Sequence, residues 1–257
     1  MAEFKYIAYD EKDKVGYLTL QRDDEINVLN IEMMGEICAV LDFLKGGGNL
    51  KALVIRAKGR AFSAGVDVSE HTEKLVGKMI DVFHRMFRLL DKIECPTVAL
   101  VQGAALGGGC ELACFCDMVV ARDGAKFGQP EIKVGVFAPV AAAAFPQYSH
   151  LKKVYELLLV GDTILAEEAE RIGLASLVYP RDDFEKKAEE FVYRLAANSA
   201  AILRLTKKAI RAGTARPFSA AIDDIEHIYL DEMMKTRDAH EGLAAFMEKR
   251  GAKWRDE

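Results

Sequence analysis

Three short stretches combine small and acidic residues in patterns that suit chemistry at a polarised carbonyl group. They are RAFSAGVD at residues 60–67, AALGGGCELA at 104–113 and KFGQPEIKVG at 126–135. Turns built from small residues leave backbone N–H groups free to face an anion or a carbonyl oxygen. The second and third stretches each add one carboxylate, Glu111 and Glu131. Paired carboxylates are suited to general acid–base catalysis.

Glu111 follows three consecutive glycines at the predicted start of a helix. Glycines are costly to order, so such a run favours the close approach of another group to the backbone. A helix N-terminus adds unpaired N–H donors and a partial positive charge. The alternative interpretation is that Glu111 only offsets the helix dipole.

Glu131 follows Pro130, which restricts Gln129 to an extended conformation. The neighbouring apolar residues are Phe127, Ile132 and Val134. A carboxylate against apolar walls has a raised proton affinity, as an acid–base catalyst requires. The alternative is a solvated loop glutamate.

The elements that position these stretches alternate between strands and helices over the first two thirds of the chain. The predicted strands are 3–9, 15–21, 51–56, 97–101 and 118–121, the first two forming a hairpin around a turn at 10–14. The predicted helices are 31–45, ended by Gly46–Gly48, then 75–92 and 110–116. Residues 57–70 are expected to be irregular, and residues 103–109 to form a turn.

From about residue 182 the pattern is only helical, with predicted helices at 182–197, 200–212, 217–234 and 238–249. This shift predicts an α/β core followed by a helical tail. No low-complexity linker separates them, so the tail is expected to pack on the core or on a neighbouring subunit.

Composition narrows the class of protein. The 257 residues are 51% apolar and 29% charged, which is typical of a globular chain that needs no metal or disulfide staple. Five scattered cysteines favour reduced thiols and a cytoplasmic location, and Cys114 and Cys116 are separated by one residue rather than the two to four usual for zinc. The net charge of −5 gives no support for a nucleic-acid partner. No apolar run reaches membrane-spanning length, and no signal core is present.

The three stretches resemble the enoyl-CoA hydratase/isomerase (crotonase) family in order and spacing. The resemblance extends through 161–180, 198–210 and 236–254. It implies an α/β fold, a crotonase-like spiral of ββα units with a helical C-terminal region. It also implies a core at 1–195 with an acyl-CoA site, and an oligomerisation region at 196–257. Family members usually form homotrimers or dimers of trimers.

The resemblance implies a role for each motif residue. The amides of Ala64 and Gly108 would form an oxyanion hole for the thioester oxygen, where each donor typically contributes about 3–4 kcal/mol. Glu111 would be the base that activates water, and Glu131 the acid that protonates carbon. Such a reaction needs no metal and no separate cofactor, because CoA is part of the substrate.

Further residues near these motifs are candidates for substrate binding. Lys58 and Arg60 either meet the CoA phosphates or are solvated loop charges. Asp67 and His71 either face the substrate or serve as a helix cap and a surface residue. The remaining candidates are Ser63, Val66, Gly107, Val136 and Phe137.

Residues 136–147, VFAPVAAAAFPQ, depart from the glycine-rich segment that common hydratases carry there. Either this segment shapes the acyl pocket, or it is a repacked helix with unchanged chemistry. Together with SAGVDVSEHT and FHRMFRLLD, it is similar to a subgroup that hydrates cyclic dienoyl-CoA esters. That similarity implies 1,4-addition of water to a substrate such as cyclohexa-1,5-diene-1-carbonyl-CoA.

Two other classes of function are alternatives to hydration. Isomerisation, retro-aldol cleavage and acyl-CoA hydrolysis occur in the same family, but two glutamates fit hydration best. A non-catalytic or RNA-binding relative would be expected to have a basic helix or to lack the glutamates.

Overall fold

The computed structural model describes residues 4–22, 24, 26–45 and 49–257. Its main sheet has six strands in the order β1-β2-β3-β5-β7-β10. These strands are β1 (Ile7–Lys12), β2 (Val15–Leu20), β3 (Ala52–Ala57), β5 (Thr97–Val101), β7 (Met118–Arg122) and β10 (Leu177–Tyr179). The predicted N-terminal hairpin is confirmed, since β1 pairs with β2 in antiparallel register. All other neighbours in this sheet are parallel.

A second sheet has four short strands in the order β4-β6-β8-β9. They are β4 (Ala61–Ser63), β6 (Ala104–Leu106), β8 (Lys126–Gly128) and β9 (Thr163–Leu165). The regions of β4 and β6 were predicted to be irregular or a turn, because three residues are too few to display a strand period. Strands β4, β6 and β8 are parallel to one another.

The chain alternates between the two sheets and then enters a helix, which produces the expected spiral of ββα units. Helix α2 (Val76–Leu90) follows β3 and β4, and α3 (Gly108–Cys114) follows β5 and β6. After β7 and β8 come α4 (Pro139–Ala144) and α5 (Leu151–Val160), then β9 and α6 (Ala166–Arg171). The predicted α/β fold class is therefore confirmed.

Helices cover both faces of the main sheet because strand side chains alternate between faces. In β3, Leu53 and Ile55 pack into the core that contains helix α1 (Ile31–Leu44) and α2. Val54 instead joins Val192 of α7 (Phe184–Ala196) on the opposite face. The glycines expected to end the first helix, Gly46–Gly48, lie outside the described residues.

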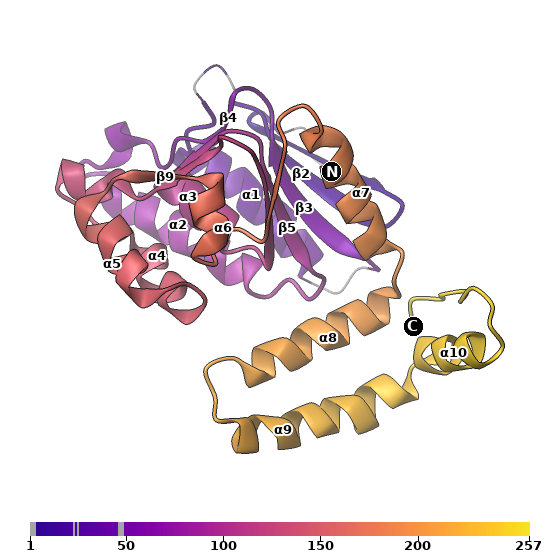
Figure 1. The fold of residues 1–257 in the computed structure, drawn as a ribbon. Helices are drawn as coiled ribbons and strands as arrows, with labels where there is room; N and C mark the ends of the chain where they lie inside the picture. The colour runs from indigo at the N-terminus through magenta and orange to yellow at the C-terminus, as the bar shows by residue number, and fades with distance from the viewer. Residues whose placement is uncertain (1–3, 23, 25, 46–48) are drawn as a thin grey trace.

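The last helices form an arm that extends away from the core (Figure 1). They are α8 (Ala200–Gly213), α9 (Phe218–His227) and α10 (Arg237–Met247). The segment predicted to be helical at 217–234 is helical, but its second half changes from α to a π turn at Ile228–Glu232 and a 3-10 turn at Met233–Lys235. No helix in the described part of the chain is long and apolar enough to cross a membrane.

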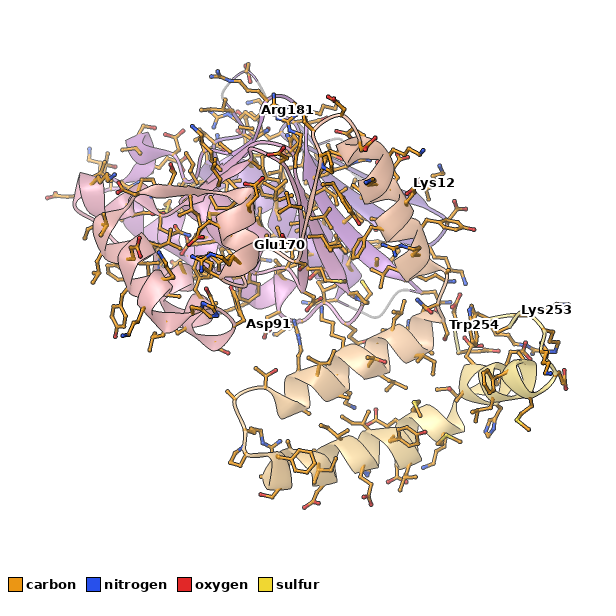
Figure 2. All side chains as sticks on the ribbon, viewed as in Figure 1. Lys12, Asp91, Glu170, Arg181, Lys253 and Trp254 are labelled. Atoms are coloured by element: carbon orange, nitrogen blue, oxygen red, sulfur yellow. The ribbon has the colours of Figure 1, made fainter. Side chains whose placement is uncertain are left out.

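The C-terminal tail returns to the base of this arm, near the start of α8 (Figure 2). The Asp256 carboxylate is buried, and it accepts hydrogen bonds from the Ala200 amide at 2.7 Å and from Lys14 Nζ at 2.7 Å. Trp254 Nε1 donates to the Ala197 carbonyl oxygen at 2.8 Å. The tail therefore ties α8 to the first hairpin of the core.

Candidate active site

Each of the three stretches singled out in the sequence contains one short strand, β4, β6 or β8, and continues past its C-terminal end. Because these strands are parallel neighbours, their C-terminal ends lie side by side at one edge of the second sheet. This edge brings together Val66 after β4, Gly108 and Glu111 after β6, and Glu131 after β8. The pairing of strands far apart in sequence thus assembles the predicted site.

Glu131 lies on a short 3-10 helix, Pro130–Val134, and its carboxylate reaches back to the glycine turn after β6. A Cβ atom on Gly107 would lie 2.6 Å from Glu131 Oε1, so a larger residue would displace the carboxylate. Gly107 also has φ 52° and ψ −131°, a conformation open essentially only to glycine. Gly107 therefore positions Glu131 through the absence of a side chain.

Glu111 is almost fully buried, with 1% of its surface exposed. Its Oε1 accepts a hydrogen bond of 2.7 Å from the Ala141 amide in the first turn of α4. Burial raises the pKa of Glu111 from 4.5 to about 8, and the nearby charge of Glu131 adds to this effect, while the Ala141 amide opposes it. The proton on Glu111 is therefore available for exchange near neutral pH.

Glu131 is only partly buried, and burial raises its pKa above the ordinary range. The charge of His71 works in the opposite direction. Both carboxyls therefore hold a proton more readily than solvated glutamates do, chiefly because burial disfavours their charged forms. The raised proton affinity predicted for Glu131 is confirmed in direction.

Gln129 is a site residue whose side chain was not predicted to take part, because the sequence indicated only its extended backbone before Pro130. Its side chain is buried, and its amide nitrogen is best oriented toward Glu131, at 3.1 Å from Oε2 and 3.2 Å from Oε1. With the Gln129 amide turned the other way, its side-chain oxygen would face only other hydrogen-bond acceptors. This one nitrogen, shared between the two carboxylate oxygens, helps to hold the carboxylate in place. Its position beside Pro130 was the only available signal.

The prediction that Ala64 supplies an oxyanion-hole amide is wrong, because the Ala64 N–H donates to the Ile26 carbonyl oxygen at 3.0 Å. Val66 is a better candidate. Its neighbours bond to Leu29, with Leu29 N–H donating to the Gly65 carbonyl at 2.8 Å and Asp67 N–H donating to the Leu29 carbonyl at 3.0 Å. In such a parallel bridge the amide of the central residue points away from the partner strand.

Gly108 stands beside Val66. It is the first residue of α3, so its N–H is one of the four that lack an acceptor within the helix. A Cβ atom on Gly108 would lie 2.7 Å from Val66 Cγ2 and 3.0 Å from Phe83 Cε2. Residue 108 must therefore be small, because a side chain there would collide with the side chains of Val66 and Phe83.

Two other candidates near β4 have structural roles. The Ser63 hydroxyl is buried, donates to the Asn27 carbonyl at 2.7 Å and accepts from the Gly65 amide at 3.2 Å. Its assignment as a substrate contact is therefore wrong, because its hydrogen-bonding groups are used within the protein. Asp67 caps the short helix Val68–Glu70 by accepting from the Ser69 amide at 3.0 Å, as its alternative interpretation expected.

The remaining candidates lie at the rim of the site. His71 is exposed, and its Nδ1 is 3.2 Å from the Asp67 carbonyl oxygen. Lys58 and Arg60 are exposed just before β4, and Lys58 Nζ is 3.3 Å from Gln21 Oε1. Val136 is 39% exposed and Phe137 71% exposed, directly before α4. Contact of these residues with substrate stays a prediction.

Residues 136–147, the segment that differs from common hydratases, contain α4. The N-terminal amides of this helix face the Glu111 carboxylate.

Within the described residues, no group of three or more His, Cys, Asp or Glu side chains could hold a metal ion. The groups gathered at this edge can therefore transfer protons between two carboxyls and stabilise charge on an oxygen through backbone amides.

Comparison with known proteins agrees with this geometry. The sequence model of the family described as enoyl-CoA hydratase/isomerase matches residues 10–257. A probable enoyl-CoA hydratase of Mycobacterium bovis is 34% identical over 252 residues, 96% of each chain. The cyclohexa-1,5-dienecarbonyl-CoA hydratase of Thauera aromatica is 36% identical over 209 residues, covering 80% of this chain and 79% of that one. A solved enoyl-CoA hydratase structure from Geobacillus kaustophilus superposes with a TM-score of 0.91 at 30% identity, covering all of both chains.

Proposed function

Because this chain belongs to the enoyl-CoA hydratase/isomerase family, we propose that it is a hydro-lyase that adds water to a conjugated enoyl-CoA thioester. The observation that carries this proposal is the pair of desolvated carboxyls, Glu111 and Glu131, on the short helices that follow the adjacent strands β6 and β8, at the same edge as the Val66 and Gly108 amides. Hydration requires one proton to leave water and another to reach carbon, so two carboxyls match its needs.

In the proposed reaction, Glu111 accepts a proton from water while the water oxygen bonds to the terminal carbon of the conjugated system. The double-bond electrons move toward the thioester carbonyl, whose oxygen becomes negative. The amides of Val66 and Gly108 stabilise this charge, replacing the earlier assignment to Ala64. Glu131 then gives its proton to the enolate carbon. Lys58 and Arg60 stay proposed contacts for the CoA phosphates.

We further propose that the acyl group is a cyclic conjugated diene, such as cyclohexa-1,5-diene-1-carbonyl-CoA. The Thauera aromatica relative that is named for this substrate supports the proposal. The alanine-rich α4 supports it as well, because this helix both follows the exposed Phe137 and donates to Glu111. The alanines of α4 would therefore change the shape of the acyl pocket while both carboxyls stay in place.

A paired assay tests the reaction and the substrate together. Purified protein is given crotonyl-CoA or cyclohexa-1,5-diene-1-carbonyl-CoA, with Glu131→Gln as the inactive control for each. We expect kcat/KM for the diene to exceed that for crotonyl-CoA by about 10²-fold or more, the discrimination that a shaped apolar pocket can reach. Turnover of crotonyl-CoA alone would contradict the proposed cyclic substrate but support the proposed hydration reaction. No turnover of either would overturn the hydratase proposal.

We also propose that the protein assembles as a homotrimer or a dimer of trimers through the arm at 196–257. Apolar side chains on the arm are widely exposed, including Phe218 at 79%, Phe246 at 82% and Met247 at 80%. Such a surface is typical of a protein interface. Sedimentation is expected to give about 85 or 170 kDa, three or six times the chain mass of 28.4 kDa. A particle of single-chain mass would overturn this proposal.

A further inference from the structure

A side-chain amide is buried in the loop between β2 and α1, beside the turn that carries the Val66 amide. The side chain is that of Asn27, which is fully buried. Its Oδ1 accepts from the Arg22 amide at 2.8 Å, and its Nδ2 donates to the carbonyl oxygens of Lys58 at 2.8 Å and Ala61 at 3.0 Å. Asn27 thus connects its own loop to both ends of the link between β3 and β4.

The backbone of the same loop runs along the turn that follows β4. The Ile26 carbonyl oxygen accepts from the Ala64 amide at 3.0 Å. Leu29 then forms the parallel bridge that directs the Val66 amide away from the loop. The direction of the Val66 amide therefore depends on where residues 26–29 lie.

Two consecutive residues of this loop have left-handed backbone conformations. Ile26 has φ 50° and Asn27 has φ 53°. Asparagine adopts this conformation more readily than most residues do, but a β-branched isoleucine adopts it rarely. Such a conformation persists only where the surrounding contacts hold it. The three side-chain hydrogen bonds of Asn27 supply these contacts directly after the strained Ile26.

We propose that Asn27 is a positioning residue for the oxyanion hole, because its buried amide fixes residues 26–29 and this loop aligns the Val66 N–H with the thioester oxygen. The inference rests on the proposed function, since it concerns the amide that would stabilise the enolate. Asn27 does not itself touch the substrate, because its side chain is fully buried and bonded within the protein. A donor misplaced by about 1 Å loses much of its effect on a developing charge.

Asn27→Gly tests this role by removing the side-chain amide while keeping a residue that adopts the left-handed conformation freely. We expect kcat for hydration to fall by about 10–100-fold with KM changed less than about threefold, because the misaligned amide acts in the transition state. The Tm should fall by about 5 °C, because the carbonyl oxygens of Lys58 and Ala61 lose a buried donor.

Thr97→Val is the matched control. Thr97 is buried at the start of β5, where its hydroxyl donates to Asp117 Oδ2 at 2.9 Å and accepts from the Asp117 amide at 2.8 Å. Its loss should lower the Tm by a similar amount, since it also leaves a buried backbone group without a partner. It should leave kcat unchanged, which separates positioning from stability.

The infrared carbonyl stretch of a bound thioester measures the oxyanion hole without any reaction. The probe is butyryl-CoA with an isotope label at the thioester carbon, because a saturated acyl chain has no double bond to hydrate. Hydrogen bonds from the two amides polarise the carbonyl and lower its stretching frequency. We expect wild type and Thr97→Val to lower the frequency equally relative to butyryl-CoA in buffer, and Asn27→Gly to lower it by less.

Ser63→Ala is a second variant that keeps the test decisive if Asn27→Gly does not fold. The Ser63 hydroxyl donates to the Asn27 carbonyl oxygen at 2.7 Å, so its loss loosens the same contact from the side of the turn. The carbonyl frequency should change in the same direction as in Asn27→Gly, by a smaller amount.

The positioning role is overturned if the folded Asn27→Gly, or Ser63→Ala in its place, gives the wild-type frequency. It is also overturned if kcat falls equally in Asn27→Gly and Thr97→Val, or if wild type itself does not lower the frequency. Absence of hydration by wild type with the expected infrared pattern would overturn the hydratase proposal and support the positioning role of Asn27.

Discussion

Glu111→Gln is expected to abolish hydration and, at alkaline pH, to make the protein more stable. An ordinary glutamate loses its proton near pH 4.5, whereas burial holds the Glu111 proton up to about pH 8. The folded state therefore binds more protons across this window, so its stability falls as the pH rises from about 4.5 to about 8. The full cost of charging the buried side chain is at most about 5 kcal/mol. Glutamine does not titrate and avoids this cost.

The measurement is the Tm of wild type and variant as a function of pH. At about pH 9 the variant should melt about 5 °C or more above wild type, and the difference should vanish toward about pH 4.5. Glutamine retains an oxygen that can accept from the Ala141 amide, so the local contact survives. Glu190→Gln, on the exposed surface of α7, is the control and should leave the melting curve unchanged. A variant destabilised at every pH would contradict the burial argument.

The same carboxyl gives the activity its pH dependence. Either assignment needs one charged and one protonated carboxyl, so kcat/KM of wild type is expected to pass through a maximum whichever glutamate is the base. In Glu131→Gln only Glu111 of the pair titrates, so the residual kcat/KM should rise with pH toward about 8 if Glu111 takes the proton from water, and fall across the same range if Glu111 donates to carbon. The sign of the slope in this variant therefore assigns the two roles.

Glu131→Gln is expected to lower kcat by about 10²–10⁴-fold with little change in KM, since the lost proton transfer belongs to the transition state. Glutamine keeps the shape that Gly107 accommodates, so the variant should fold normally. Steady-state kinetics on the substrate that wild type prefers would measure this effect. A variant with near-normal kcat would show that Glu131 has no part in proton transfer.

Gln129→Met complements this variant, since it removes the amide nitrogen that donates to the charged Glu131 carboxylate. The pKa of Glu131 should rise further, because hydrogen bonds to the charged form normally hold it down. The limb of the pH profile that belongs to Glu131 should then move to higher pH, by about one unit, while kcat falls less than in Glu131→Gln. An unchanged pH profile would limit Gln129 to a packing role.

Longer elements were predictable from periodicity, and shorter ones were not. The helix at 31–45 and the strand at 97–101 appear as α1 and β5 because their apolar spacing extends over enough residues to identify the period. Strands β4 and β6 contain three residues each and look like loops in sequence. They become strands only because β4, β6 and β8 pair with one another.

The sequence by itself determined the family, the α/β spiral with its helical arm, and the two carboxyls, because these depend on residue types at short spacings. Which amides face the substrate was decided by tertiary structure. Ala64 and Val66 are two residues apart, and only the pairing with Ile26 and Leu29 shows which N–H is already used. The pKa of Glu111 and the contact of Gln129 with Glu131 also required the fold, since burial and distance arise from segments remote in sequence.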